Sequence, residues 1–337
     1  MADKTYQVTV LGDGGWGTAL ALVSARKGNP TLLWSAFPDY VQVLEKKREN
    51  EKFLPGIKIP SEIIITSDLT KAVQFADIIV LAVPSQYLRN VLFKLKEANL
   101  SSKILVSVAK GIEAKTLARP SEVIKSVLGS VPLAILSGPS HAEEVARGVP
   151  TLVVVASESE KLAEMVQEAF RDSRFRVYIQ TDVVGVELGG ALKNIIAIGA
   201  GLCDGLGLGA NTKAALLARG LLEMTQLGVR MGANPNTFFG LSGLGDLVTT
   251  CISEYGRNLR VGRELGQGKK LKQILSEMQM VAEGVETTRS AYQLAQRHGV
   301  TAAIISEIYK MLFEDKAPKQ ALEDLMSREA HEELKQY

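Results

Sequence analysis

The stretch Gly12-Asp13-Gly14-Gly15-Trp16-Gly17 decides the fold of this sequence, because it joins a segment typical of a strand to a segment typical of a helix. Residues 6–11 are rich in β-branched and apolar side chains, as in a buried strand that ends at a tight turn. Residues 18–26 are apolar on most sides and are followed by a glycine and a proline, as at the end of a buried helix. A glycine-rich turn in this position is much more informative than the same glycines alone.

The glycines of this turn each fit a role in binding a dinucleotide. Gly12 permits the tight turn, Gly14 lets a pyrophosphate approach the backbone, and Gly17 allows the helix to pack closely on the strand. The unpaired amides at the start of the helix, with the positive end of its dipole, bind phosphate without a cationic side chain. The turn therefore predicts a dinucleotide site, and a glycine-rich turn with a purely structural role is the alternative.

The rest of the N-terminal half alternates between apolar runs and longer segments that suit crossover helices. We expect a helix over residues 159–170 and further strands over residues 31–34, 62–65, 78–83, 104–108, 133–136, 151–156 and 175–179. This alternation predicts an α/β fold of the Rossmann type, a doubly wound parallel sheet that ends near residue 180.

From residue 185 onward the apolar residues follow a helical period instead. We expect helices over residues 185–203, 213–231, 258–265, 290–296 and 303–313. The sequence therefore predicts two domains, a dinucleotide-binding Rossmann domain over residues 1–183 and an all-α substrate-binding and catalytic domain over residues 184–337. A length of 337 residues is ample for two cores.

Composition excludes several classes of function. Lys and Arg number 39 against 37 Asp and Glu, a net charge of +2, so we expect no nucleic-acid partner. Cys203 and Cys251 are too few for a disulfide framework, and with three histidines no metal-ligand pattern forms. Residues 1–7 do not resemble a secretory signal, and residues 195–203 are too short to span a bilayer. We therefore expect a cytoplasmic protein without a metal or a membrane insertion.

Two lysines are candidates for chemistry. Lys193 lies in a stretch of small and apolar residues that cannot be a solvated face, so burial is expected to lower its pKa towards neutrality, as suits a general acid. A lysine that extends from a buried helix to water is the alternative. Lys110 follows a predicted strand, where it can meet an anionic or carbonyl oxygen or remain an exposed loop charge. His141 has no carboxylate partner in the pattern and is not expected to be catalytic.

A glycine-rich connection at residues 241–247 places Asp246 after a tight turn, and Arg257 opens a predicted helix beyond it. An arginine at a helix start suits a phosphate, because its guanidinium forms a bidentate fork and the helix amides add favourable dipoles. The second predicted strand, residues 31–34, is followed by Ser35-Ala36-Phe37-Pro38, which carries no charge, so both NAD and NADP remain possible cofactors.

The motifs Gly-Asp-Gly-Gly-Trp-Gly-Thr-Ala, Val-Pro-Ser, Ala-Lys-Gly-Ile-Glu, Ser-Gly-Pro-Ser, Gly-Gly-Ala-Leu-Lys-Asn, Gly-Leu-Gly-Asp-Leu and Arg-Asn occur in order over nearly the whole chain. Together they resemble bacterial NAD(P)-dependent glycerol-3-phosphate dehydrogenases. The resemblance implies interconversion of dihydroxyacetone phosphate and glycerol 3-phosphate, in the service of phospholipid synthesis, by a cytoplasmic homodimer.

The resemblance also implies roles for individual residues. Lys193 is similar to the family's proton donor and acceptor, and Lys110 to a catalytic lysine that touches both cofactor and substrate. The other implied substrate-binding residues are Gly138, Ser140, Asp246, Gly256, Arg257 and Asn258. The implied cofactor-binding residues are Gly12, Gly14, Gly15, Trp16, Gly17, Lys110, Ala142, Arg257, Val281 and Glu283.

This sequence departs from the family pattern at two positions. Ala36 stands where relatives often carry a basic residue or histidine, which puts a preference for NADPH in doubt. Gly256 replaces the serine that often precedes the Arg-Asn pair, so one substrate contact is lost or comes from the backbone. Two alternatives stay open, another β-hydroxyacid-type dehydrogenase that acts on a carboxylate substrate and a non-catalytic dinucleotide-binding sensor.

Overall fold

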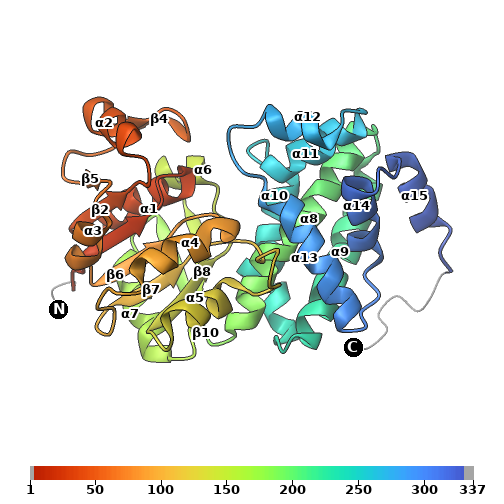
Figure 1. Cartoon of the computed structure of the whole chain (residues 1–337). Helices are drawn as coiled ribbons and strands as arrows, with labels where there is room; N and C mark the ends of the chain where they lie inside the picture. The colour runs from red at the N-terminus through yellow and green to blue at the C-terminus, as the bar shows by residue number, and fades with distance from the viewer. Residues whose placement is uncertain (1–3, 330–337) are drawn as a thin grey trace. The chain divides into compact units, whose positions relative to one another are not determined.

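The computed structural model describes residues 4–329, and the chain forms two compact units (Figure 1). Of the described residues, unit 1 contains residues 4–109 together with Pro120–Val183. Unit 2 contains Lys110–Arg119 and residues 184–329. The segment Lys110–Arg119, which the sequence pattern left within the first domain, therefore packs with the second unit.

Unit 1 is built on an eight-stranded sheet in the order β10-β9-β8-β7-β6-β1-β2-β5. Its strands are β1 (Val8–Leu11), β2 (Thr31–Trp34), β5 (Ile64–Thr66), β6 (Ile78–Leu81), β7 (Ile104–Ser107), β8 (Leu133–Ser137), β9 (Thr151–Ala156) and β10 (Phe175–Gln180). The central strands are buried along their whole length, which explains why they read as continuous apolar runs. The predicted α/β sheet of the Rossmann type is confirmed.

The sheet is mixed, and the prediction that all its strands are parallel was wrong. β8 and β9 pair antiparallel, with Ile135 opposite Ala156 and Ser137 opposite Val154. Between them the chain forms only a loop and the short helix α6 (Ala142–Ala146), so it turns back beside β8 instead of crossing over the sheet. The helix α7 (Glu160–Phe170) then makes the crossover that keeps β10 parallel to β9.

The sequence pattern also missed a small hairpin of β3 (Glu49–Asn50) and β4 (Leu54–Lys58), whose strands are too short and polar to show a period. The remaining helices of unit 1 are α1 (Gly15–Arg26), α2 (Pro38–Lys47), α3 (Leu69–Phe75), α4 (Ser85–Leu95) and α5 (Pro120–Leu128). The helix α1 begins at Gly15, three residues earlier than expected. Trp16 and Gly17 therefore lie in its first turn.

All the regular secondary structure among the described residues of unit 2 is helical, as predicted. It contains α8 (Val183–Gly205), α9 (Ala210–Arg230), the 3-10 turn η1 (Pro235–Phe239), the π-helical turn η2 (Leu241–Gly245), α10 (Asp246–Ile252), α11 (Arg257–Gly266), α12 (Leu271–Ser276), α13 (Glu283–Arg297), α14 (Ala303–Phe313) and α15 (Pro318–Met326). The expected helix over residues 290–296 is the second half of α13, and α10, α12 and α15 were not predicted.

The helix α8 is the core of unit 2. By length and composition it could cross a membrane, but 89% of its most apolar window is buried within the protein, so it is a core helix and not a membrane span. Its glycines permit close packing, since a Cβ at Gly201 would lie 2.0 Å from the Leu259 carbonyl oxygen of α11. A Cβ at Gly262 would lie 1.9 Å from the Ile198 carbonyl oxygen, so the two backbones touch.

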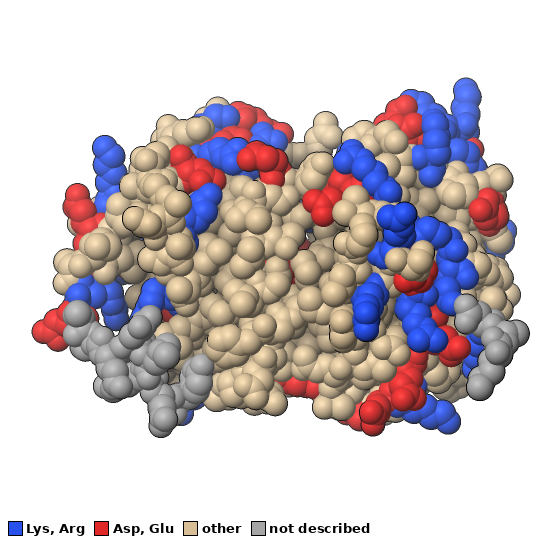
Figure 2. Space-filling model, turned by 180° about the vertical axis from the view of Figure 1, so that it is seen from behind, with Lys and Arg blue, Asp and Glu red and all other residues tan. Residues whose placement is uncertain are grey.

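Charged side chains of both signs lie near one another on the face shown in Figure 2, and a wide area of that face carries neither sign. This distribution accords with the nearly equal numbers of basic and acidic residues, 39 and 37. The charges that bear on chemistry are instead buried, and they lie within unit 2.

Candidate active site

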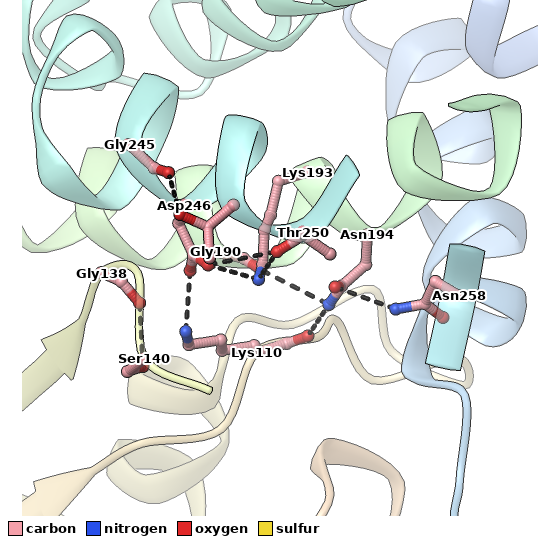
Figure 3. Close-up of polar contacts among 11 residues, drawn as sticks. Lys110, Gly138, Ser140, Gly190, Lys193, Asn194, Gly245, Asp246, Thr250 and Asn258 are labelled. Atoms are coloured by element: carbon pink, nitrogen blue, oxygen red, sulfur yellow. Dashed lines mark hydrogen bonds and ion pairs between the residues drawn. The ribbon is translucent and has the colours of Figure 1, made fainter. Parts of the chain in front are cut away.

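Two lysines share one buried carboxylate in unit 2 (Figure 3). Lys193 Nζ, from α8, lies 2.5 Å from Asp246 Oδ1, and Lys110 Nζ, from the segment that follows β7, lies 2.7 Å from Asp246 Oδ2. The side chains of Lys193, Lys110 and Asp246 are 7%, 15% and 2% exposed, respectively. The structure therefore brings together three residues that the sequence placed in separate motifs.

Thr250 completes this cluster, and the sequence analysis did not single it out. Its hydroxyl oxygen accepts a hydrogen bond of 2.5 Å from Lys193 Nζ and lies 3.3 Å from Asp246 Oδ1. Its spacing from Asp246 could have indicated this role, because a residue four positions further along a helix lies on the same face. An ammonium has three hydrogens, and among the described residues Asp246 and Thr250 are the hydrogen-bond partners of Lys193. The third hydrogen can meet a substrate oxygen.

The electrostatics of the cluster suit a proton donor. Burial lowers the pKa of Lys193 to about 8, against the opposing effect of Asp246 and with the help of the Lys110 charge. Burial alone would raise the pKa of Asp246, but the charges of Lys110 and Lys193 outweigh it and hold that pKa below its usual value. Two ammonium groups and one carboxylate leave one net positive charge, which attracts an anion.

Close backbone packing fixes the position of Asp246. A Cβ at Gly189 of α8 would lie 2.6 Å from the Ser242 carbonyl oxygen, so only glycine lets η2 approach α8 so closely. A Cβ at Gly243 would lie 2.1 Å from the Phe238 carbonyl oxygen. The π-helical turn η2 leads directly into α10, so these contacts set where Asp246 begins that helix.

Two asparagines connect the lysine cluster to other helices. Asn194 Nδ2 donates to the Lys110 carbonyl oxygen at 3.0 Å, and Asn194 Oδ1 accepts from Asn258 Nδ2 at 2.9 Å. Asn258 Oδ1 in turn accepts from the Gly284 amide of α13 at 3.0 Å. Asn258, which was expected to bind substrate, therefore also holds α8, α11 and α13 together, and Asn194 fixes the backbone of Lys110.

The predicted residues around α11 lie together in a second group. Arg257 is exposed at the first turn of α11, and its Nη1 donates to the Val281 carbonyl oxygen at 3.0 Å. Gly256 precedes it at the N-cap, and a Cβ there would lie 3.0 Å from Leu259 Cβ and 3.1 Å from the Thr250 carbonyl oxygen. Glu283 begins α13, just after Val281.

The glycine-rich turn of unit 1 has the geometry that a pyrophosphate needs. Gly12 has a φ of +126°, and a Cβ there would lie 2.5 Å from the Ala82 carbonyl oxygen. A Cβ at Gly17 would lie 1.9 Å from the Gly12 carbonyl oxygen, so α1 packs tightly on the turn. A Cβ at Gly14 would meet nothing within 4 Å, which leaves open the approach to the start of α1. These residues fit a dinucleotide.

Unit 1 contains further residues that were expected to bind cofactor or substrate. Gly15 lies close to Phe53 and to α6, since a Cβ at Gly15 would lie 2.7 Å from the Phe53 carbonyl oxygen and 3.5 Å from Ala142 Cβ. The indole Nε1 of Trp16 is buried and finds no hydrogen-bond partner among the described residues. Gly138 has a φ of +129° and its carbonyl oxygen accepts a 2.9 Å hydrogen bond from Ser140 Oγ (Figure 3).

Within residues 4–329 the structure contains no group of three or more His, Cys, Asp or Glu side chains arranged to hold a metal ion. Cys203 and Cys251 are both buried free thiols. Burial raises the pKa of Cys251 to about 12, so this thiol, although it lies in α10 beside the cluster, stays protonated.

Two family models match this chain. Residues 7–163 match the NAD-dependent glycerol-3-phosphate dehydrogenase N-terminus, and residues 182–323 match the NAD-dependent glycerol-3-phosphate dehydrogenase C-terminus. Together the two matches cover most of both units.

Individual relatives agree with these models over nearly the full length. The chain is 51% identical over 331 residues to a glycerol-3-phosphate dehydrogenase [NAD(P)+] of Chlorobium phaeobacteroides (strain BS1), covering 97% of this chain and 99% of the relative. It is 52% identical over 328 residues to the protein of the same name from Thermoanaerobacter sp. (strain X514), with 97% and 99% covered. The crystal structure of a glycerol-3-phosphate dehydrogenase from Coxiella burnetii superposes with a TM-score of 0.93 at 38% identity, covering 96% of this chain and 99% of that one.

Proposed function

The chain belongs to the NAD(P)+-dependent glycerol-3-phosphate dehydrogenases, which are oxidoreductases, and from this premise we propose that the buried cluster of Lys193, Lys110 and Asp246 protonates the substrate. The observation that carries the proposal is the shared carboxylate, with an ammonium at 2.5 Å on one oxygen and at 2.7 Å on the other. The reaction in the reductive direction converts dihydroxyacetone phosphate to glycerol 3-phosphate.

The reduced nicotinamide, when bound, supplies a hydride to the carbonyl carbon of the substrate. Lys193 donates a proton to the carbonyl oxygen as negative charge develops on it. With a pKa of about 8, Lys193 is mostly an ammonium at neutral pH and is still acidic enough to give up its proton. Asp246 and Thr250 hold two of its hydrogens, and so they direct the third.

Lys110 contributes electrostatic stabilisation. Its ammonium adds a second positive charge within hydrogen-bond reach of Asp246, so the cluster keeps a net positive charge that favours an oxyanion. Asn194 holds the Lys110 backbone by a 3.0 Å hydrogen bond, which fixes this charge before the substrate arrives. A preformed charge of this kind lowers the barrier because it needs no reorganisation during the reaction.

The phosphate of the substrate is assigned to Arg257 at the start of α11. The amides of that first turn carry no side-chain cap, and the guanidinium is held by the Val281 carbonyl oxygen at 3.0 Å. Further substrate contacts are assigned to Gly138, Ser140, Gly256 and Asn258. The dinucleotide is assigned to Gly12, Gly14, Gly15, Trp16, Gly17, Lys110, Ala142, Arg257, Val281 and Glu283, and the open approach at Gly14 supports this assignment.

A kinetic comparison of two lysine variants tests the proposal. Lys193→Met keeps an unbranched side chain of similar size but removes the ammonium and its proton, so kcat should fall at least about a hundredfold while dinucleotide binding is retained. Lys272→Met, at an exposed position of α12, is the matched control and should keep normal kcat. Near-normal kcat in Lys193→Met would show that another group donates the proton.

A substrate panel tests the substrate assignment. Dihydroxyacetone phosphate should be reduced with a much higher kcat/KM than carboxylate-bearing carbonyl compounds of similar size, because Arg257 and the α11 amides suit a phosphate. Arg257→Ala should raise KM for dihydroxyacetone phosphate and lower kcat as well, since the anchored phosphate orients the carbonyl. Equal kcat/KM for a carboxylate substrate would contradict the assignment.

In the cell, we assign to the chain the supply of glycerol 3-phosphate for phospholipid synthesis, as a cytoplasmic homodimer. Family membership supports this role. Size-exclusion chromatography with light scattering tests the dimer, and loss of growth on disruption, rescued by added glycerol 3-phosphate, tests the supply role.

A further inference from the structure

A carboxylate is buried at the carboxyl end of β2, and it comes from the glycine-rich turn, not from the strand. Asp13 is 6% exposed, and its Oδ2 accepts a 2.7 Å hydrogen bond from Oγ of Ser35, the first residue after β2. The carbonyl oxygen of Asp13 accepts a second hydrogen bond, at 2.7 Å, from Asn50 Nδ2. Both the backbone and the side chain of Asp13 are therefore fixed.

Among the described residues, Ser35 is the side chain that donates a hydrogen bond to the Asp13 carboxylate, which also accepts one from its own backbone amide. Ser35 Oγ accepts a hydrogen bond from the Phe37 amide at 3.1 Å, and because an ionised carboxylate can only accept, the hydroxyl hydrogen of Ser35 is donated to Asp13 Oδ2. A carboxylate has about four lone-pair positions, so these two hydrogen bonds leave it the capacity to accept a further one from a ligand hydroxyl. The neighbouring Gly14 presents open space where a Cβ would be, so a dinucleotide at this turn passes beside Asp13.

The position of this charge has a known consequence in dinucleotide-binding sheets. An acidic group at the end of the second strand binds the 2′-hydroxyl of the adenosine ribose, whereas a basic group there accommodates a 2′-phosphate. The end of β2 itself supplies neither, because Ser35, Ala36 and Phe37 carry no charge. Asp13, from the glycine-rich turn that follows β1, places a carboxylate at the end of β2 instead.

The cations Arg48 and Lys52, which follow α2, offer little attraction for a 2′-phosphate to offset the charge of Asp13. Arg48 donates to the carbonyl oxygens of Pro60 and Ile63 at 3.3 and 2.7 Å, which engages its guanidinium. Lys52 is the cation whose charge acts on Asp13, and its Nζ lies over the ring of Phe53, 4.9 Å from the centroid. A single exposed lysine does not provide the bidentate fork that phosphate recognition favours.

We propose that Asp13 makes this chain select NAD(H) over NADP(H), by accepting a hydrogen bond from the ribose 2′-hydroxyl and repelling a 2′-phosphate. The inference rests on the proposed function in one respect, since it requires a dinucleotide to bind at the glycine-rich turn. Repulsion between a buried carboxylate and a phosphate a few ångströms away corresponds to at least about a tenfold difference in Kd.

Binding titrations of the full chain without substrate test this inference. NADH and NADPH are titrated into the wild type and into Asp13→Asn, with calorimetry as the readout. Asparagine keeps the shape of the side chain and its hydrogen bond from Ser35 but removes the charge. The ratio of the NADPH Kd to the NADH Kd should be at least about ten in the wild type and fall about tenfold in the variant, mainly through tighter NADPH binding.

Asp39→Asn is the matched control, because it removes an exposed carboxylate from the first turn of α2 and should leave the ratio unchanged. Asp13→Ser, which also removes the charge, serves if Asp13→Asn does not fold, as judged by circular dichroism. An unchanged ratio in the charge-removing variants, a ratio that changes in Asp39→Asn instead, or equal affinities in the wild type would overturn the inference. If neither dinucleotide binds the wild type, the proposed function fails as well.

Discussion

Asp246→Asn is the change that most directly tests whether Lys193 donates the proton. In the wild type the pKa of Lys193 is about 8, because burial lowers it, Asp246 raises it and Lys110 lowers it. The variant loses the one contribution among these three that favours the ammonium form. A carboxylate at 2.5 Å is typically worth about 1 to 3 pKa units, so the pKa of Lys193 should fall to roughly 5 to 7.

The size of the effect follows from the protonated fraction. With a pKa of about 8, about nine-tenths of Lys193 is an ammonium at pH 7, and with a pKa of about 6 only about one-tenth is. The reductive rate at pH 7 should therefore fall roughly tenfold from this cause alone. The total loss is larger, because Lys110 also loses its 2.7 Å ion pair with Asp246.

The pH profile separates the two causes. Reduction requires the ammonium form of Lys193, so kcat/KM should decline as pH rises through about 8 in the wild type. Oxidation of glycerol 3-phosphate requires the neutral amine, so its kcat/KM should rise with pH and level off above the same value. In Asp246→Asn both limbs should move down together by at least about one unit.

Steady-state kinetics in both directions, from about pH 5 to pH 10 with saturating dinucleotide, give this result directly. Asp315→Asn is the control, because that side chain is 87% exposed and its removal should leave both limbs in place. A wild-type reductive rate that does not decline above pH 8, or limbs that stay near 8 in Asp246→Asn, would refute Lys193 as the titrating donor.

Three further substitutions test the packing and the buried charges of unit 2. Gly189→Ala should destabilise the protein by about 1 to 3 kcal/mol in urea unfolding and lower kcat, because its Cβ would lie 2.6 Å from the Ser242 carbonyl oxygen. Glu187→Gln should cost up to about 3 kcal/mol in the same assay, because it removes the buried carboxylate charge that pairs with the Arg119 guanidinium, and a cost below about 1 kcal/mol would count against the pair. Burial raises the pKa of Glu223 from 4.5 to about 7, so the folded protein keeps a proton that the unfolded chain loses. Relative to Glu223→Gln, thermal melts should therefore show the wild type losing about 3 kcal/mol as pH rises from 4.5 to about 7 and nothing more above that.

Local patterns were sufficient to predict the part of the fold that binds the dinucleotide. The apolar run, the glycine turn and the helix that follows it each depend on residues adjacent in sequence, and β1 and α1 form there. The lowered pKa of Lys193 was also predictable from local sequence. A helix that is apolar on all sides must be buried, whatever it packs against, and burial lowers the pKa of a lysine.

Strand direction was not predictable from the same patterns. An apolar run indicates a buried strand but carries no sign of its orientation, so the antiparallel β9 was missed. The connection from β8 to β9 contains a five-residue helix, α6, which is too short to cross over a sheet, although the sequence there does not show how short that helix is. Asp13 is a similar case, since its neighbour Ser35 follows a different strand.

The contacts of the segment Lys110–Arg119 could not be predicted from local sequence patterns. By sequence Lys110 is a loop residue just beyond β7, and that position marked it as a candidate for contact with an anionic or carbonyl oxygen. Its partners, however, are determined by packing within unit 2, where Ile112 is fully buried in the helical core and Arg119 pairs with Glu187 of α8. Because both ends of this segment are held against the helix that carries Lys193, the two lysines can share Asp246, and a change at Glu187 should move the Lys110 ammonium without touching the reacting atoms.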